Sequence, residues 1–273
     1  MFYLLNFFIQ MKILLKNDDL NEALSNVSNL GFVPTMGGIH KGHISLIKKS
    51  KLRSNKTLVS IFVNPRQFDN KNDYKKYPRN TKKDLSILKK LKVDYVFLPN
   101  KIDIYSSKTR KKINLNNKDK ILCAKFRKGH FEGVLDVMNR LTYLINPKKI
   151  FMGEKDFQQL YLVKRFIEKR YKTQIIPCKT IRNKNKLALS SRIFLLKKKE
   201  KINAENLSKN LFFLKKKLSQ KKNIPKLLDI KKKQLSKLFQ VNIEYLELRN
   251  KNTLKKTRSI KNAKLFVAYY LGL

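Results

Sequence analysis

The sequence predicts an α/β fold: a Rossmann-like parallel sheet flanked by helices, followed by a smaller α+β domain at the C-terminus. Through the first two thirds of the 273 residues, short and almost wholly apolar runs alternate with amphipathic stretches, which is typical of a parallel sheet buried on both faces. After Arg182 the glycines stop until Gly272, and lysine-rich amphipathic segments dominate. We therefore expect two domains, residues 11–181 and 182–273, preceded by an extension of unknown role at residues 1–10.

β-Branched and aromatic runs predict the strands of the sheet. They cover Gly31–Pro34, Thr57–Asn64, Val93–Pro99, Lys149–Met152 and Gln174–Ile181. Helical spacing of apolar residues predicts the helices around the strands. These cover Ile44–Leu52, Thr81–Leu91, Gly133–Ile145 and Gln158–Lys169. In the second domain we expect lysine-rich helices from Leu195 to Phe239, then the strand-like VNIEYLELRN and a closing apolar run from Lys264 to Leu271.

The formal net charge of +45 is the most unusual property of the composition. Such a charge attracts polyanions but does not indicate a fold. Only 12 of the 64 basic residues are arginine, the side chain that makes bidentate contacts to nucleic acids. We therefore interpret the lysine excess as compositional drift over a solvated surface and expect no specific nucleic-acid partner. A basic RNA-binding protein is the alternative from another class, and it predicts steeply salt-dependent affinity.

Two features bear on the compartment. The two cysteines, Cys123 and Cys178, lie far apart without metal-ligand spacing, which suits a reducing compartment and predicts a cytoplasmic protein. The apolar start, MFYLLNFFIQMKILL, lacks a basic n-region and a small-residue cleavage site and is too short to span a bilayer. We expect no membrane partner.

The rarest residue types gather in two segments. Glycine occurs only 8 times and histidine 3 times, so each glycine is expected to serve a backbone need. His40, His43 and His130 each lie within two residues of a glycine. Core packing would scatter three histidines, and their placement beside glycines predicts a site instead.

The segment GFVPTMGGIHKGHISL reads as a strand, a glycine turn and a helix. This geometry directs free backbone N–H groups and the positive end of a helix at one point, where a phosphate can bind. His40 and His43 share a helical face and can donate hydrogen bonds to a phosphate during group transfer. A tight turn with two capping histidines is the structural alternative. The chain has no Walker motif, and a zinc site would lack a third ligand.

The string from His40 to His43 resembles the H-x-G-H signature of the nucleotidyltransferase superfamily. Together with VPTMGGIHKGH, SIFVNPRQF, YPRNTKKDL, RKGHFEGV, FMGEKDFQQL and LALSSR, it makes the chain similar to the pantothenate synthetase family from about Met11 onwards. The resemblance implies ATP-dependent condensation of pantoate with β-alanine, through a pantoyl adenylate, to pantothenate, AMP and pyrophosphate. It also implies a homodimer. Another H-x-G-H nucleotidyltransferase with a different acceptor is the nearest alternative.

Polar residues follow two of the predicted strands, at the sheet edge where ligands of open α/β sheets bind. The amide of Gln67 can donate and accept hydrogen bonds, which suits a substrate with hydroxyl and carboxylate groups. Lys155 can neutralise phosphate charge, and Asp156 can cap a helix or bind a ribose hydroxyl. Arg192, at the end of LALSSR, can pair with the departing pyrophosphate from a loop expected between the domains.

The resemblance assigns these and further residues to ligands. It implies ATP contacts from Met36, Gly37, Gly38, Ile39, His40, Lys41, Gly42, His43, Gly153, Glu154, Lys155, Asp156, Ile181, Leu189, Ser190, Ser191 and Arg192. It implies substrate contacts from Gln67, Gln159, Asn64, Arg127 and His130. We expect catalytic roles for His43, His40, Lys155 and Arg192. Mg²⁺ is expected with ATP, and Asp84 is the candidate metal-associated acid. The C-terminal domain is expected to act as a lid.

Overall fold

The computed structural model describes residues 10–105, 113–218 and 223–271. The chain divides into two compact units: residues 1–119 with 127–180, and residues 120–126 with 181–273. The second unit begins at Ile181, one residue before the predicted boundary. It also takes in residues 120–126, which no pattern in the sequence had marked.

The first unit is built on a six-stranded sheet in which every pair of neighbouring strands is parallel. Its strands are β1 (Lys12–Leu14), β2 (Leu30–Thr35), β3 (Lys56–Ile61), β4 (Tyr95–Phe97), β5 (Lys149–Gly153) and β6 (Gln174–Cys178). Their order across the sheet is β1-β4-β3-β2-β5-β6. The predicted Rossmann-like class is therefore confirmed. The edge strand β1 was not predicted, because its residues belong to the apolar start of the chain, which was considered only as a possible membrane segment.

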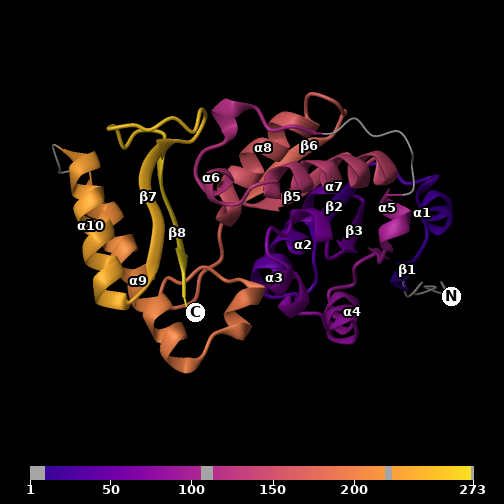
Figure 1. Cartoon of the computed structure of the whole chain (residues 1–273). Helices are drawn as coiled ribbons and strands as arrows, with labels where there is room; N and C mark the ends of the chain where they lie inside the picture. The colour runs from indigo at the N-terminus through magenta and orange to yellow at the C-terminus, as the bar shows by residue number, and fades with distance from the viewer. Residues whose placement is uncertain (1–9, 106–112, 219–222, 272–273) are drawn as a thin grey trace, which may run out of the picture. The chain divides into compact units, whose positions relative to one another are not determined.

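Helices connect and cover these strands (Figure 1). They are α1 (Asn17–Leu24), α2 (Lys41–Arg53), α3 (Lys71–Lys76), α4 (Thr81–Lys90), α5 (Lys101–Tyr105), α7 (His130–Ile145) and α8 (Phe157–Ile167). Leu46 and Ile47 of α2 and Leu88 of α4 pack with Val33 and Val59 of the sheet. The alternate strand residues Phe32, Leu58, Phe97, Ile150 and Ile175 are also buried, as expected for a sheet covered on both faces.

The strand order contains a topological switch point. The chain passes from β2 to β3 on one side, while β5, the other neighbour of β2, leads on to β6 in the opposite direction. Ligands of open α/β sheets bind at the carboxyl ends of the strands at such a point. The segments that follow β2 and β5 are therefore where a site is expected, and they carry the glycine and histidine motifs.

The second unit combines an antiparallel hairpin, β7 (Asn242–Asn250) and β8 (Ala263–Tyr270), with the helices α9 (Lys198–Lys217) and α10 (Ile224–Phe239). The two helices lie on one side of the hairpin (Figure 1), where Leu207, Leu228 and Leu246 belong to one apolar core. A bulge between Ile243 and Tyr245 shifts the register. The extra residue lets Ile243 and Leu246 face the same core although three positions separate them.

The short helix α6 (Cys123–Phe126) accounts for the presence of residues 120–126 in the second unit. Sγ of Cys123 lies 2.8 Å from the hydroxyl oxygen of Tyr245 in β7. The ring of Phe126 packs 6.0 Å from the ring of Tyr245, between centroids. Tyr245 lies next to the bulge, so its ring is available to α6 rather than to the core formed with α9 and α10.

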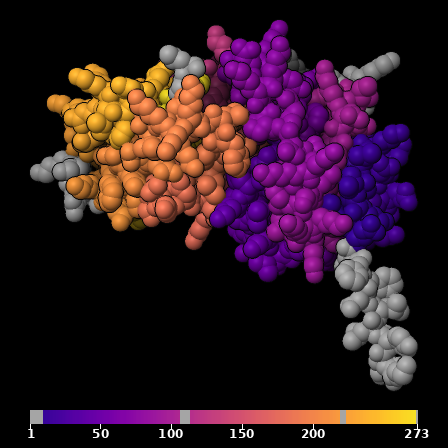
Figure 2. Space-filling model, turned by 90° about the horizontal axis from the view of Figure 1, so that it is seen from below, coloured from indigo at the N-terminus to yellow at the C-terminus, as the bar shows by residue number. Residues whose placement is uncertain are grey.

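The lysine-rich stretch from Leu195 to Phe239 forms helices as predicted, and most of its lysines are exposed. Long side chains project from the orange part of the surface, to which α9 belongs (Figure 2). No helix in the described residues is long and apolar enough to cross a membrane.

Candidate active site

The loop between β2 and α2 is shaped by two glycines in the left-handed region. Gly37 has φ 80° and Gly38 has φ 61°, a conformation that costs glycine little and other residues more. The hydroxyl of Thr35 accepts a hydrogen bond from the Gly37 amide at 3.2 Å and donates to the carbonyl of Ser60 at 2.7 Å. The turn is thereby tied to the neighbouring strand β3.

Asp84 of α4 fixes the same loop from outside the sheet. Its carboxylate accepts hydrogen bonds from the amides of Gly38 at 2.9 Å and Ile39 at 2.8 Å, and the residue is only 3% exposed. A Cβ at Gly37 would lie 2.9 Å from Oδ2 of Asp84. The sequence indicated an acid with a ligand role here; the structure adds a supporting contact to the loop.

The two histidines lie together where α2 begins. Nδ1 of His40 accepts a hydrogen bond from the amide of Gly42 at 3.0 Å and so caps the helix. The ring centroids of His40 and His43 are 4.1 Å apart. Because Nδ1 of His40 is an acceptor, its proton lies on Nε2, which can donate to a ligand. A Cβ at Gly42 would lie 2.6 Å from Cε1 of His40, which explains the glycine between the histidines.

Both imidazoles are held in the neutral form. Burial lowers the pKa of His43 to about 3, and the neighbouring His40 and Lys155 contribute to the same shift. Burial and Lys155 also lower the pKa of His40, while Asp156 opposes the shift. Nδ1 of His43 is buried and has no hydrogen-bond partner among the described residues. At neutral pH the pair therefore provides hydrogen-bonding groups, and the positive charge of the site comes from Lys155.

Lys155 and Asp156 reach this position from the other side of the switch point. They belong to a 3₁₀ turn, Glu154–Asp156, between β5 and α8, and Nζ of Lys155 lies 3.2 Å from Oδ1 of Asp156. A Cβ at Gly153 would meet nothing within 4 Å, so the backbone leading into the turn borders open space. The structure thus brings together the motifs that follow β2 and β5.

The adjacent glutamines on α8 differ in their surroundings. The buried Gln158 donates from Nε2 to the carbonyl of Asp119 at 3.3 Å and so serves the fold. Gln159 is half-buried, and no described residue forms a hydrogen bond with its side chain. Gln159 is therefore the member of the pair that is available to a ligand.

Gln67 lies in a polar cluster after β3. It ends a 3₁₀ turn, Pro65–Gln67, whose cap is the buried Asn64. Nδ2 of Asn64 lies 3.4 Å from Oε1 of Gln67, and Nε2 of Gln67 lies 2.7 Å from Sδ of Met36. Nδ1 of His130 lies 2.6 Å from the carbonyl oxygen of Gln67. The cluster links the segments that follow β2 and β3 to the start of α7.

A second layer holds this cluster, and sequence reasoning missed it. The hydroxyl of Tyr105 donates to Oδ1 of Asn64 at 2.7 Å. The guanidinium of Arg66 stacks 3.9 Å above the ring of Tyr105 and pairs with Asp136 at 2.8 Å. Arg140 pairs with the same carboxylate at 2.8 Å. Only the i,i+4 spacing of Asp136 and Arg140 could have indicated part of this layer from the sequence.

Arg127 lies just before α7, where its carbonyl accepts a hydrogen bond from the amide of His130 at 3.3 Å. Burial lowers the pKa of His130, and the charge of Arg127 lowers it further, whereas a hydrogen bond to the Gln67 backbone opposes the shift. Arg127 therefore lies close to the cluster around Gln67.

The predicted LALSSR segment belongs to the second unit. The amide of Leu189 donates to the carbonyl of Ile181 at 3.0 Å. Ser190 caps a 3₁₀ turn, Ser191–Leu195, by accepting a hydrogen bond from the amide of Arg192 at 3.3 Å. Ser191 is buried, whereas Arg192 is exposed. The segment thus contains both a backbone pairing and a cap.

The described residues include no group of three or more His, Cys, Asp or Glu side chains that could hold a metal ion. Asp84 already uses both carboxylate oxygens for backbone amides. The metal role of Asp84 stays a prediction.

Comparison with known proteins gives one consistent family. The family model described as pantoate–β-alanine ligase matches residues 12–273. A pantothenate synthetase of Clostridium botulinum is 40% identical over 247 residues, covering 89% of this chain and 88% of that protein. One from Endomicrobium trichonymphae is 38% identical over 271 residues, covering 96% and 94%.

Solved structures agree with this match. The crystal structure of pantothenate synthetase from Thermus thermophilus is similar with a TM-score of 0.86 at 27% identity, covering 96% of this chain and 95% of that one. Pantoate–β-alanine ligase from Francisella tularensis, complexed with β,γ ATP and β-alanine, has a TM-score of 0.79 at 32% identity, covering 96% and 94%.

Proposed function

The chain belongs to the pantoate–β-alanine ligase family, and from this premise we propose that its first unit binds ATP and pantoate at the switch point between β2 and β5. The protein is a ligase that condenses pantoate with β-alanine at the expense of ATP. One observation carries the placement of the site: two neutral imidazoles with ring centroids 4.1 Å apart, at the start of α2 and near Lys155.

The reaction proceeds in two steps through an adenylate. A carboxylate oxygen of pantoate attacks the α-phosphorus of ATP, an O–P bond forms, and the bond to the departing pyrophosphate breaks. The amine of β-alanine then attacks the acyl carbon of this mixed anhydride. The C–N bond forms, the amine loses a proton, and AMP leaves with the electrons of the broken C–O bond. This chemistry needs positioning and charge stabilisation and no protein nucleophile.

His43, His40 and Lys155 serve the first step. Nε2 of His40 carries a proton and can donate to a phosphate oxygen, as the capping bond from Gly42 to Nδ1 requires. His43 acts on the charge that builds up at phosphorus, from a position where its neutral form is maintained by burial. The ammonium of Lys155 offsets the repulsion between pantoate and the triphosphate.

The other nucleotide contacts come from the segments that follow β2 and β5 and from the second unit. The amides and side chains from Met36 to His43 line the phosphates, and Gly153, Glu154 and Asp156 contact the nucleotide from the turn after β5. We assign Ile181 to adenine, and Leu189, Ser190, Ser191 and Arg192 to the phosphates. The second-unit assignments rest on the family match, which extends through residue 273.

Pantoate binds beside the nucleotide, at the cluster around Gln67. The amides of Gln67 and Gln159 can donate to its carboxylate or hydroxyl groups and accept from the hydroxyls. Asn64 orients Gln67 across 3.4 Å. His130 and Arg127 complete the ligand contacts from the start of α7, where His130 touches the Gln67 backbone at 2.6 Å.

Further expectations complete the proposal. Mg²⁺ accompanies ATP and is held mainly by phosphate oxygens and water. The second unit acts as a lid, and the active protein is a homodimer. A cytoplasmic location is supported by two free cysteines, because such thiols persist in a reducing compartment.

Release of AMP from ATP tests the proposal, with pantoate and β-alanine each omitted in turn. We expect release to require both substrates, and pyrophosphate–ATP exchange to require pantoate alone. AMP release that is indifferent to pantoate would reject this acceptor and favour another H-x-G-H nucleotidyltransferase.

A further inference from the structure

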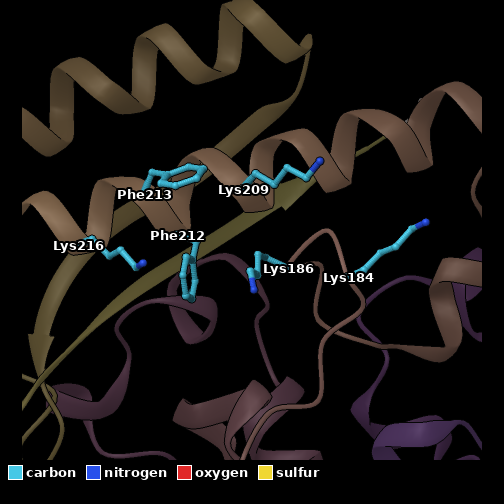
Figure 3. Close-up of a pocket in the computed structure, with 6 residues that line it drawn as sticks. All are labelled: Lys184, Lys186, Lys209, Phe212, Phe213 and Lys216. Atoms are coloured by element: carbon cyan, nitrogen blue, oxygen red, sulfur yellow. The ribbon is translucent and has the colours of Figure 1, made fainter.

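The second unit contains a cavity of about 300 Å³ at which lysines and phenylalanines meet. It is lined by Lys184, Lys186, Lys209, Phe212, Phe213 and Lys216, and we call these six residues the lysine pocket (Figure 3). Four of them come from α9, and the other two come from the turn between Arg182 and Ala188. A cavity of this volume lies at the lower end of the range for small-ligand sites.

The turn that carries Lys184 and Lys186 is rigidly built. Arg182 and Ala188 form a β-bridge, and the side chain of Asn183 accepts hydrogen bonds from the amides of Asn185 and Leu187, each at 3.0 Å. These interactions define the position of both lysines. A flexible surface loop would not hold Lys184 and Lys186 beside α9.

Glu205 ties this turn to α9. Its carboxylate accepts hydrogen bonds from the side chains of Asn183, at 2.8 Å, and Asn185. The acid nearest to the lysine pocket in α9 is therefore already engaged. Its single negative charge is outnumbered by the positive charges of the four lysines that line the cavity.

Three of the lysines that line the pocket are not paired with an acid in the part of the chain that the structure describes. Lys184, Lys186 and Lys209 have no carboxylate within ion-pair distance among the described residues. Lys186 is also held at φ 68°, a region that a side chain other than glycine or asparagine occupies only at a cost.

Two aromatic rings line the pocket beside the lysines. Nζ of Lys186 lies 5.3 Å from the ring centroid of Phe212, and Nζ of Lys216 lies 5.4 Å from it. Figure 3 shows the Phe212 ring directed from α9 toward Lys186. Phe213 is 60% exposed, so its ring is accessible to a stacking partner.

We propose that the lysine pocket binds a segment of single-stranded nucleic acid, with one base stacked on a phenylalanine ring and the flanking phosphates on the lysines. Flat rings beside cations match a chain in which bases alternate with phosphates. An anion without an aromatic ring would use the lysines but leave the exposed ring of Phe213 uncovered. Lysine, as a point charge, gives binding without base preference.

Fluorescence anisotropy with a labelled oligouridylate of about twelve nucleotides tests the proposal on the full-length protein. Binding is measured without ATP and again with saturating ATP, which occupies the catalytic site. The test variant is K184Q/K186Q/K209Q, and its charge-matched control is K226Q/K233Q/K237Q on α10. We expect at least a tenfold loss of affinity in the test variant and less than a threefold loss in the control. The slope of log affinity against log salt should fall by about 2 in the test variant.

A second pair of variants tests whether the ring of Phe213 stacks on a base. Phe213→Leu should weaken binding at least about fivefold, because base stacking is lost, whereas Phe213→Tyr keeps a ring and should bind normally. Both triple variants should keep wild-type pantothenate synthesis. Equal losses in test and control variants would mean that only bulk charge attracts the oligonucleotide. That result, abolition of binding by ATP, or tight binding of free uridine monophosphate in place of the strand would overturn the proposal.

Discussion

Asp84 accepts a hydrogen bond from the backbone amide of Ile39 at 2.8 Å, although 45 positions separate the two residues. A second bond, from the amide of Gly38, reaches the same carboxylate at 2.9 Å. The loop that carries the histidines is therefore held by α4 as well as by its own glycines. The position of His40 and His43 depends on an acid that contacts neither ring.

Asp84→Ala should lower the free energy of unfolding by about 2–4 kcal/mol, because two amides lose their buried partner. Chemical denaturation measures this loss. Asp229→Ala, at an exposed position of α10, is the control and should change stability by less than about 0.5 kcal/mol. A loss that appears only when Mg²⁺ is present would instead assign Asp84 to the metal.

His43→Ala should reduce kcat by roughly 10²–10³, the usual cost of one transition-state donor. The KM for ATP should change much less, since the amides and Lys155 still bind the phosphates. Steady-state kinetics separates the two parameters. Turnover close to that of the wild type would remove His43 from its proposed role.

The histidine pKa values predict how the protein responds to pH. His43 has a folded-state pKa of about 3 against an ordinary 6.5, so between these values the unfolded chain binds a proton that the folded chain does not. The contribution of His43 to the free energy of unfolding is therefore fully present above pH 6.5, and it is lost as the pH drops toward 3. His40 and His130, whose pKa values are also lowered, act in the same direction.

NMR titration of the imidazole resonances measures this directly, because the chain has three histidines. At about pH 5 we expect the His43 ring to be neutral. His43→Gln, which cannot be protonated, should flatten the pH dependence of the unfolding free energy. A His43 ring that titrates near its ordinary pKa of 6.5 would contradict the account.

Two glycine substitutions separate folding from binding. A Cβ at Gly133 would lie 2.1 Å from the carbonyl oxygen of Arg66, so Gly133→Ala must displace α7 or the turn that carries Gln67. We expect a lower melting temperature and a raised KM for pantoate. Gly153→Ala has open space and an ordinary φ of −76°, so it should fold normally and change only the KM for ATP. Equal melting temperatures for the two variants would show that the contact at Gly133 can be relieved.

Tyr105→Phe tests the layer behind the pantoate cluster. The substitution removes the 2.7 Å hydrogen bond to Asn64 and leaves the ring on which Arg66 stacks. We expect the KM for pantoate to rise about threefold to tenfold with kcat nearly unchanged, because Tyr105 acts through Asn64 and Gln67. A matching fall in kcat at constant KM would give Tyr105 a different role.

The sheet and the first part of the site could be predicted because their signals are local. Apolar runs marked five of the six strands of the sheet, and scarce glycines marked the loop where left-handed φ values are needed at Gly37 and Gly38. The pair His40 and His43 could be recognised from spacing alone. Of the adjacent glutamines, the resemblance selected Gln159, and the structure adds that Gln158 bonds to the backbone of Asp119.

Contacts between distant segments left no such signal. Asp84 and Ile39, or Tyr105 and Asn64, become neighbours only through the fold. Strand β1 lies in the apolar start of the chain and was not recognised as part of the sheet. Residues 120–126 join the second unit through Tyr245, more than a hundred positions away. Family resemblance supplied ligand roles, but it did not supply these supporting contacts.

A crystal structure of the protein with a non-hydrolysable ATP analogue and pantoate tests the central claim most directly. The account predicts one triphosphate in contact with His43, Lys155 and Arg192, with the pantoate carboxylate facing the α-phosphorus beside Gln67. A nucleotide bound away from the carboxyl ends of β2 and β5, or a triphosphate that none of these three side chains touches, would contradict it.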